Sequence, residues 1–173
     1  TLADAVRGAN KTLSSDGSGA ELTDKSDGHL DAFTSDGFTV GAGSGGDARV
    51  NDGSNTYVAW NWLAGNGTAS NGDGATASTV SVNSTARFSI VSWTGTGSGT
   101  TIGHGLGAKP KIIFVKNRTS ATNWVVNVGE LVGADERSLR LNSTNAIMAD
   151  AAQPDGYTYN NTTTTFSTSG GSG

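Results

Sequence analysis

The sequence predicts an all-β fold, an antiparallel β-sandwich of the lectin-like or jelly-roll type with little helix and room for two tandem halves. Among its 173 residues are 26 Gly, 23 Thr, 20 Ser and 14 Asn, so residues that favour helices are scarce. Val, Ile, Thr and aromatic residues are grouped in short runs separated by Gly, Asn and Asp, which is the pattern of strands joined by turns.

The composition also excludes several classes of protein. The net charge of −4 and the pI of about 4.9 argue against nucleic-acid binding, and no apolar run is long enough to insert into a membrane. The absence of Cys excludes disulfides and thiolate metal sites. No motif implies a cofactor. The chain begins with Thr1 and shows no signal-peptide pattern, so we expect an excised or processed piece of a longer chain.

Residues 1–64 are expected to form an acidic, β-rich half-unit that ends in an aromatic strand. In residues 56–63, TYVAWNWL, the alternation places Val58, Trp60 and Trp62 on one face. Such a face can stack on sugars, but core packing is favoured because Leu, Ile and Met are few. Near the N-terminus, residues 1–11 have apolar residues at helical spacing and are the one helix-like stretch.

Residues 65–79, rich in Gly, Asn and Ser, are expected to form a linker or long loop. Residues 80–173 are then a second β-sandwich unit, incomplete at its C-terminal end. Strand-like runs occur at residues 87–94, 111–116, 123–127 and 138–142. Because residues 112–115 are consecutively apolar, 111–116 is predicted to be the central strand, buried on both faces.

A weak internal repeat appears at an offset of 128 residues. Leu13 aligns with Leu141, Thr34 with Thr162, and Phe38 with Phe166. Chance alignment in a chain rich in Ser and Thr is the alternative. If the repeat is real, the chain begins and ends partway through a unit.

Several segments resemble a known domain in their order and spacing: DAVRGANKTLSS, FTSDGFTVG, NTYVAWNWLAG, FSIVSWTGTGSGTTIGHGLGAKPKIIFVKNR and NWVV. The domain occurs in tail-fibre and related virion proteins of tailed bacteriophages, and the resemblance covers residues 2–166. It implies a β-rich, lectin-like sandwich in a virion protein and brings no catalytic motif. The ends of the chain depart from the family pattern.

Residues that bear chemistry are few. His29 and His104 lie in no zinc or triad pattern, which predicts a protein that is not an enzyme. The sequence GHGLGA at residues 103–108 is predicted to be a tight turn, since a β-run and not a helix follows it. Candidate contacts to a glycan or receptor are Trp93, Trp124, Asp27 and Asp31. The carboxylates of Asp24, Asp27 and Asp31 fit a solvated loop better than a calcium site.

The expected function is a non-enzymatic bacteriophage virion structural protein, a segment of a tail or capsid fibre that presents loops for attachment to the host surface. We expect it on the virion surface as a homotrimer that contacts other virion proteins, with a host glycan as a further partner. The alternative is a carbohydrate-binding adhesin module of a bacterial surface protein. A third hypothesis is a polysaccharide-degrading fibre domain.

Overall fold

The computed structural model describes residues 1–23, 28–43, 50–128, 137–149 and 160–168 of the protein. All ladders between its strands are antiparallel, and these described ranges contain no helix. The protein is therefore all-β and sandwich-like, which confirms the predicted fold class. No helix long and apolar enough to cross a membrane occurs in these ranges.

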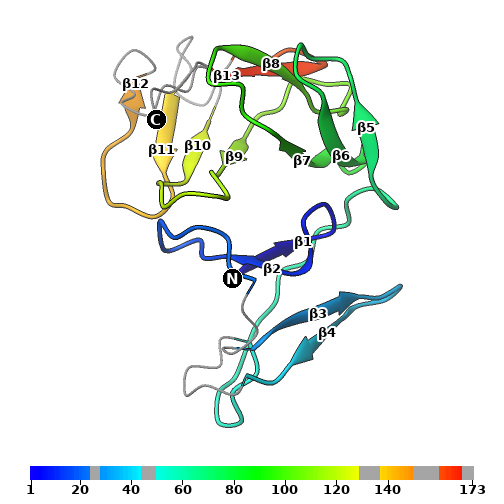
Figure 1. Ribbon diagram of the computed structural model, residues 1–173, viewed down its shortest axis with the longest axis vertical. Coiled ribbons are helices and arrows are strands. Elements are labelled where there is room, and N and C mark those ends of the chain that lie inside the picture. Colours follow the sequence, from blue (N-terminus) through cyan, green and yellow to red (C-terminus); the bar gives the residue numbers. More distant parts are fainter. Residues whose placement is uncertain (24–27, 44–49, 129–136, 150–159, 169–173) are drawn as a thin grey trace.

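Three groups of strands surround the core in the larger part of the molecule (Figure 1). One sheet contains β5 (Ala69–Asn71), β6 (Ser78–Asn83) and β7 (Phe88–Trp93). A second contains β9 (Ile113–Val115), β10 (Val125–Asn127), β11 (Arg137–Arg140) and β12 (Met148–Ala149). β8 (Thr100–Gly103) pairs with β13 (Thr165–Thr168). The core between them is formed by Ile102, Val115, Val125 and Phe166.

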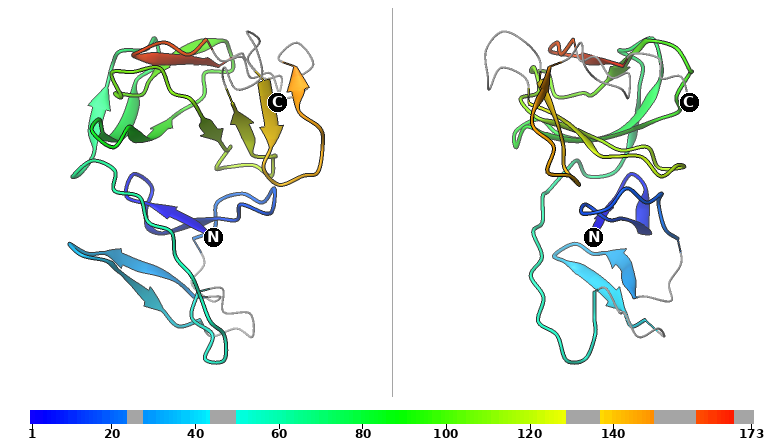
Figure 2. Two further views of the ribbon diagram at one scale, coloured as in Figure 1. Left: turned by 180° about the vertical axis from the view of Figure 1, so that it is seen from behind. Right: turned by 90° about the vertical axis from the view of Figure 1, so that its left-hand side faces the viewer.

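Two small hairpins form the rest of the described chain. β1 (Leu2–Asp4) pairs with β2 (Gly8–Leu13), and β3 (His29–Phe33) pairs with β4 (Phe38–Gly41). In all three views β1 and β2 lie between the larger part and the β3–β4 hairpin (Figures 1 and 2).

The helix expected in residues 1–11 is wrong. The side-chain Oδ1 of Asp4 accepts hydrogen bonds from the N–H groups of Val6 and Arg7, at 3.1 and 2.9 Å. Gly8 has a φ of 102°, which a residue with a Cβ rarely adopts. This Asp-stabilised turn reverses the chain after β1, and the hairpin replaces the helix.

The prediction of a central strand at residues 111–116 is also wrong. β9 is the edge of its sheet, and β10, between β9 and β11, is the buried strand. Phe114 on β9 is 57% exposed and Ile112, just before β9, is 49% exposed, while Val115 faces the core. A consecutive apolar run thus does not distinguish a central strand from an edge strand that has one apolar outer face.

Residues 65–79 contain a strand, which corrects the expectation of a linker or long loop. β5 pairs with β6, and the segment after it contacts β8. The N–H of Ala75 donates to Oγ1 of Thr101 at 2.9 Å, and the N–H of Thr76 donates to the carbonyl of Thr101 at 3.1 Å. This stretch is therefore built into the sheets of the larger part.

Gly74 lies so close to β8 that a methyl group does not fit. A Cβ at this position would lie 2.7 Å from the carbonyl carbon of Thr101 and 2.8 Å from Cα of Ile102. We expect Gly74→Ala to lower the free energy of unfolding by about 1–3 kcal/mol, because backbone has to shift. Gly72→Ala, with no atom within 4 Å of the added Cβ, is the matched control. Equal urea midpoints for the two variants would contradict this prediction.

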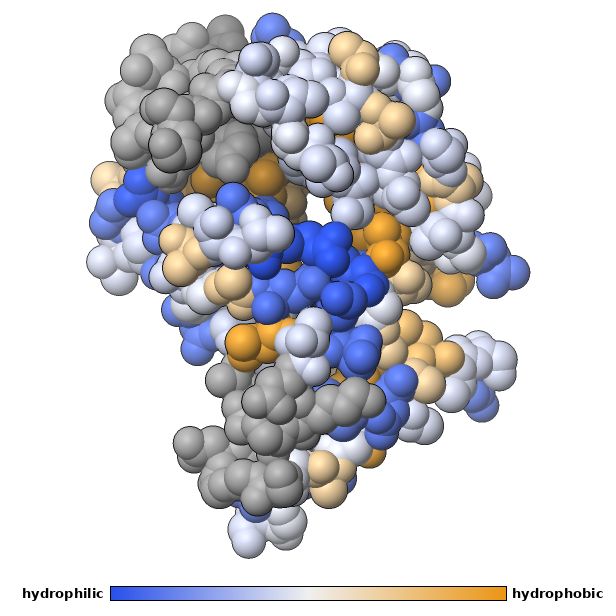
Figure 3. Space-filling view, in the orientation of Figure 1, coloured by the Kyte–Doolittle hydropathy of each residue, from blue (hydrophilic) through white to orange (hydrophobic). Residues whose placement is uncertain are grey.

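A charged cluster attaches the N-terminal segment to the second half of the chain. The carboxylate of Glu21 accepts hydrogen bonds from Nε and Nη2 of Arg118 at 2.8 and 2.9 Å and from Nη1 of Arg7 at 3.2 Å. Arg7 also bonds to Asp4. Hydrophilic residues gather in the middle of the molecule, over β1 and β2 (Figure 3). This cluster therefore bridges segments nearly 100 residues apart in sequence.

The repeat at an offset of 128 residues has a structural counterpart. The N–H of Thr34 donates to the carbonyl of Gly37 at 2.9 Å, and the N–H of Thr162 donates to the carbonyl of Thr165 at 2.8 Å. β4 follows the first turn, and β13 follows the second. The two aligned segments therefore share the same local turn ahead of a strand.

Candidate functional site

The most exposed apolar surface of the described chain is an extended segment, residues 57–63, which we call the aromatic arm. The exposed fractions are 49% for Tyr57, 82% for Val58, 78% for Trp60, 62% for Trp62 and 78% for Leu63. The arm is not a strand. The prediction that residues 56–63 form a strand with Trp60 and Trp62 in the core is therefore wrong for this chain.

Both ends of the aromatic arm are anchored. At its start, the N–H of Asp52 donates to the Tyr57 hydroxyl at 2.9 Å. At its end, Nδ2 of Asn83 donates to the carbonyl of Leu63 at 3.2 Å, and Trp62 stacks on Phe88 with ring centroids 6.3 Å apart. The arm is thus held at both ends as an extended strap.

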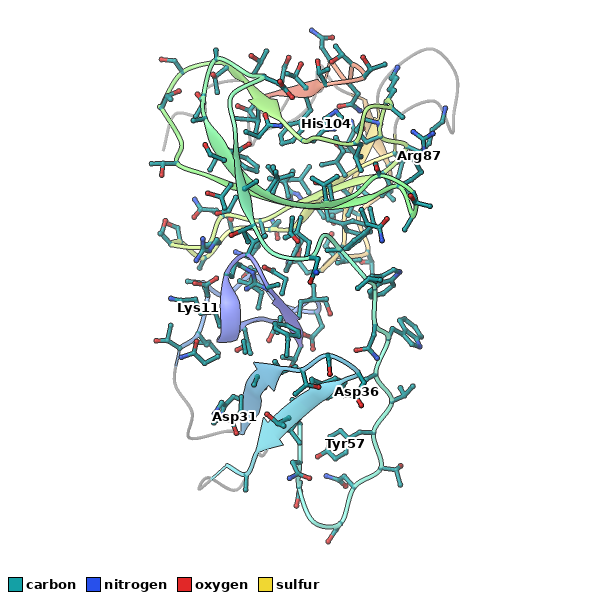
Figure 4. The ribbon with its side chains drawn as sticks, turned by 90° about the vertical axis from the view of Figure 1, so that its right-hand side faces the viewer. Lys11, Asp31, Asp36, Tyr57, Arg87 and His104 are labelled. Atoms are coloured by element: carbon teal, nitrogen blue, oxygen red, sulfur yellow. The ribbon has the colours of Figure 1, made fainter. Side chains whose placement is uncertain are left out.

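The aromatic arm runs past the β3–β4 hairpin as a single extended chain, with Tyr57 on it (Figure 4). The hairpin also exposes apolar side chains, with Phe33 at 45%, Phe38 at 38% and Val40 at 36%. The arm and the hairpin together present apolar groups that a monomeric protein usually covers.

The tryptophans predicted as glycan contacts are used for packing. Trp124 is only 6% exposed, and its Nε1 donates to the carbonyl of Ser14 at 2.8 Å. Trp93 is half-buried, with an edge-to-face contact to Phe166 at 5.4 Å between centroids. Trp124 therefore offers no free ring face to a sugar, which corrects that expectation, and Trp93 lies against the core.

The predicted acidic contacts are only partly described. Asp24 and Asp27 lie outside the described residues. Asp31 is on β3, and its Oδ1 lies 2.6 Å from Nε2 of His29. Within the described part of the chain no group of three His, Asp or Glu residues is placed to hold a metal ion.

His104 is a structural group in the turn before β9. Its Nδ1 accepts a hydrogen bond from the N–H of Leu106 at 3.1 Å, and its Nε2 lies 3.4 Å from the carbonyl of Thr162. Gly105 and Gly107 have φ values of 71° and 65°, which glycine adopts freely. The tight turn predicted for residues 103–108 is therefore confirmed, and both ring nitrogens of His104 face backbone groups.

Burial lowers the pKa of His104, and the Thr162 carbonyl and the Asp73 charge only partly oppose this effect. The unfolded chain then takes up a proton near pH 6.5, the ordinary His value, while the folded chain does not. We expect stability to fall as the pH drops below about 6.5, by at most about 1.4 kcal/mol per pH unit. Urea titrations at several pH values would measure it. His104→Gln should have a shallower slope, and an unchanged slope would contradict the prediction.

Comparison with known protein families identifies the family of this chain. The family described as "Domain of unknown function (DUF7483)" matches residues 1–173. The chain belongs to the DUF7483 family. No curated protein and no solved structure matches it. Because the description of the DUF7483 family states no function, a functional argument for this DUF7483 chain depends on its own surface.

Sequence reasoning missed the aromatic arm as a surface feature. The alternation of Val58, Trp60 and Trp62 correctly marks one face of an extended segment, but alternation does not say whether that face is covered. One available signal was charge, because no Asp, Glu, Lys or Arg lies between Asp52 and Asp73. Such an uncharged aromatic stretch is typical of a surface that meets a partner.

Proposed function

We propose that this chain is a non-enzymatic structural protein of a bacteriophage virion, a segment of a tail or capsid fibre that presents loops for attachment to the host surface. The aromatic arm carries the proposal, because five large apolar side chains on a strap held at both ends are suited to contact between molecules. The resemblance to tail-fibre domains supports the virion assignment. The fibre segment would act on the particle surface as a homotrimer next to other virion proteins.

Use of His104 in a backbone turn supports a structural protein rather than a hydrolase. A general base needs a ring nitrogen that can reach a reacting group, whereas Nδ1 of His104 accepts from the Leu106 N–H. The ring of His104 therefore stabilises the turn that contains it.

Antibodies raised against the chain provide the direct test. We expect gold-labelled antibody to decorate purified phage particles along a fibre. Labelling of bacterial cells grown without phage, with unlabelled particles, would contradict the proposal and favour an adhesin.

A carbohydrate-binding adhesin is the second candidate, and Trp60 favours it. An indole that is 78% exposed beside Asn61 can stack on a sugar ring while the amide bonds to its hydroxyls. A glycan array with the parent chain and Trp60→Ala distinguishes the two candidates. Binding that is lost in a variant of unchanged stability would support the adhesin.

A further inference from the structure

The β3–β4 hairpin is a two-stranded sheet that shows apolar groups to solvent. β4 has β3 as its strand partner, and none of the other described strands pairs with it. Phe38 and Val40 on β4 are 38% and 36% exposed. Because two-stranded sheets are only marginally stable in water, the hairpin is suited to accept a third strand.

The internal repeat shows how a matching strand is covered in the second half. Phe38 of β4 aligns with Phe166 of β13 at the offset of 128 residues. β13 pairs with β8, Trp93 packs on Phe166, and Phe166 is 3% exposed. Each of the two Phe residues lies on a strand with one paired neighbour, but only Phe166 is covered, by Trp93 of β7, whereas Phe38 is 38% exposed.

The aromatic arm has the properties of a third strand for the β3–β4 sheet. It is extended, carries no charge and has large apolar side chains on both sides. None of the described strands pairs with residues 58–62. In the same chain, the anchors at Leu63 and Phe88 hold the arm in its exposed position.

We infer that the aromatic arm of one copy of this chain adds as a strand to the outer edge of β4 in a second copy. The inference supplies a contact for the self-association that the proposed function includes, but it requires neither a virion nor a receptor. Pairing extends the hairpin to three strands and places arm aromatics opposite the Phe38 and Val40 side chains.

A second copy fits this surface because each chain carries one donor and one acceptor. Two copies can pair reciprocally, or three copies can pair each with the next in a closed ring. In either arrangement every aromatic arm and every β4 edge is covered. Neither the arm nor β4 carries a charge, so the chain's net charge of −4 opposes the contact only weakly.

The available apolar area is large enough for a stable contact. At about 150–250 Å² for each aromatic side chain, the exposed parts of Trp60 and Trp62 amount to roughly 300 Å². Val58, Leu63 and the acceptor side chains add to this, so the apolar area available on each copy approaches the roughly 800 Å² per partner of stable complexes.

The natural absence of Cys allows a direct test in the full chain. A Val40→Cys chain with a long tag and a Val58→Cys chain with a short tag are mixed and treated with a short bis-maleimide cross-linker. We expect a product with the summed mass of both chains, at several times the yield of a control pair in which Val58→Cys is replaced by Ser98→Cys, an exposed position between β7 and β8.

Adding Trp60→Ser to the Val58→Cys chain should weaken association at least tenfold by sedimentation, and Trp60→Phe should largely restore it. A cross-linking yield equal to the control overturns the inference. So does a Val40→Cys, Val58→Cys double variant that cross-links only within one chain, or a Trp60→Ser chain that associates normally but loses glycan binding. Labelling of virions by antibody tests the proposed function alone. Failure of the proposed function can therefore be distinguished from failure of the inferred pairing between copies.

Discussion

Replacing Trp124 with alanine is expected to lower the free energy of unfolding by about 3–5 kcal/mol, the usual cost of removing a buried aromatic side chain. Trp124 is 6% exposed, and its Nε1–H bonds to the carbonyl of Ser14. The variant leaves a cavity beside the start of β10 and the Ser14 carbonyl without its donor. Urea unfolding followed by circular dichroism would measure the loss.

Trp60→Ala is the matched control, because the same side chain is removed from a position that is 78% exposed. We expect its stability in the monomeric state to change by less than about 0.5 kcal/mol. Trp124→Phe keeps most of the packing and removes the bond to Ser14, so it should lie between the two. Equal losses for Trp124→Ala and Trp60→Ala would contradict the burial of Trp124.

The four tryptophans show what sequence alone can predict. Trp60 and Trp62 were expected in the core and lie on the surface, whereas Trp124 was expected as a contact and is buried. Alternation identifies the faces of an extended segment, but the cover on a face comes from residues distant in sequence. Ser14 lies 110 residues from Trp124, and no local pattern indicates that contact.

The strands were predictable where they depend on local residues. The runs predicted at residues 87–94, 123–127 and 138–142 overlap β7, β10 and β11, because short apolar runs between turn residues suffice to mark a strand. Their order was not predictable. β9 has the apolar run of a central strand and lies at an edge, since order depends on pairing between distant segments.

Glu21→Gln is expected to lower the free energy of unfolding by about 3 kcal/mol, at the lower end of the cost of breaking a buried ion pair. The side chains of Glu21 and Arg7 are 8% and 7% exposed. The variant removes the carboxylate that pairs with Arg7, Lys11 and Arg118, and it weakens the attachment of the N-terminal segment. Asp36→Asn, at an exposed carboxylate in the β3–β4 turn, is the control and should change stability by less than about 0.5 kcal/mol.

The same carboxylate predicts how acid acts on the protein. Burial by itself raises the pKa of Glu21, but the hydrogen bonds from Arg118 and Arg7 outweigh it, so the pKa lies below its usual value. The stability that the ionised group contributes is therefore present above the ordinary Glu pKa of about 4.3 and is lost as the pH falls through the lower folded value. Between pH 5 and pH 3 the parent should lose more stability than Glu21→Gln does. Parallel curves for the two proteins would mean that Arg7 and Arg118 do not stabilise the ionised carboxylate.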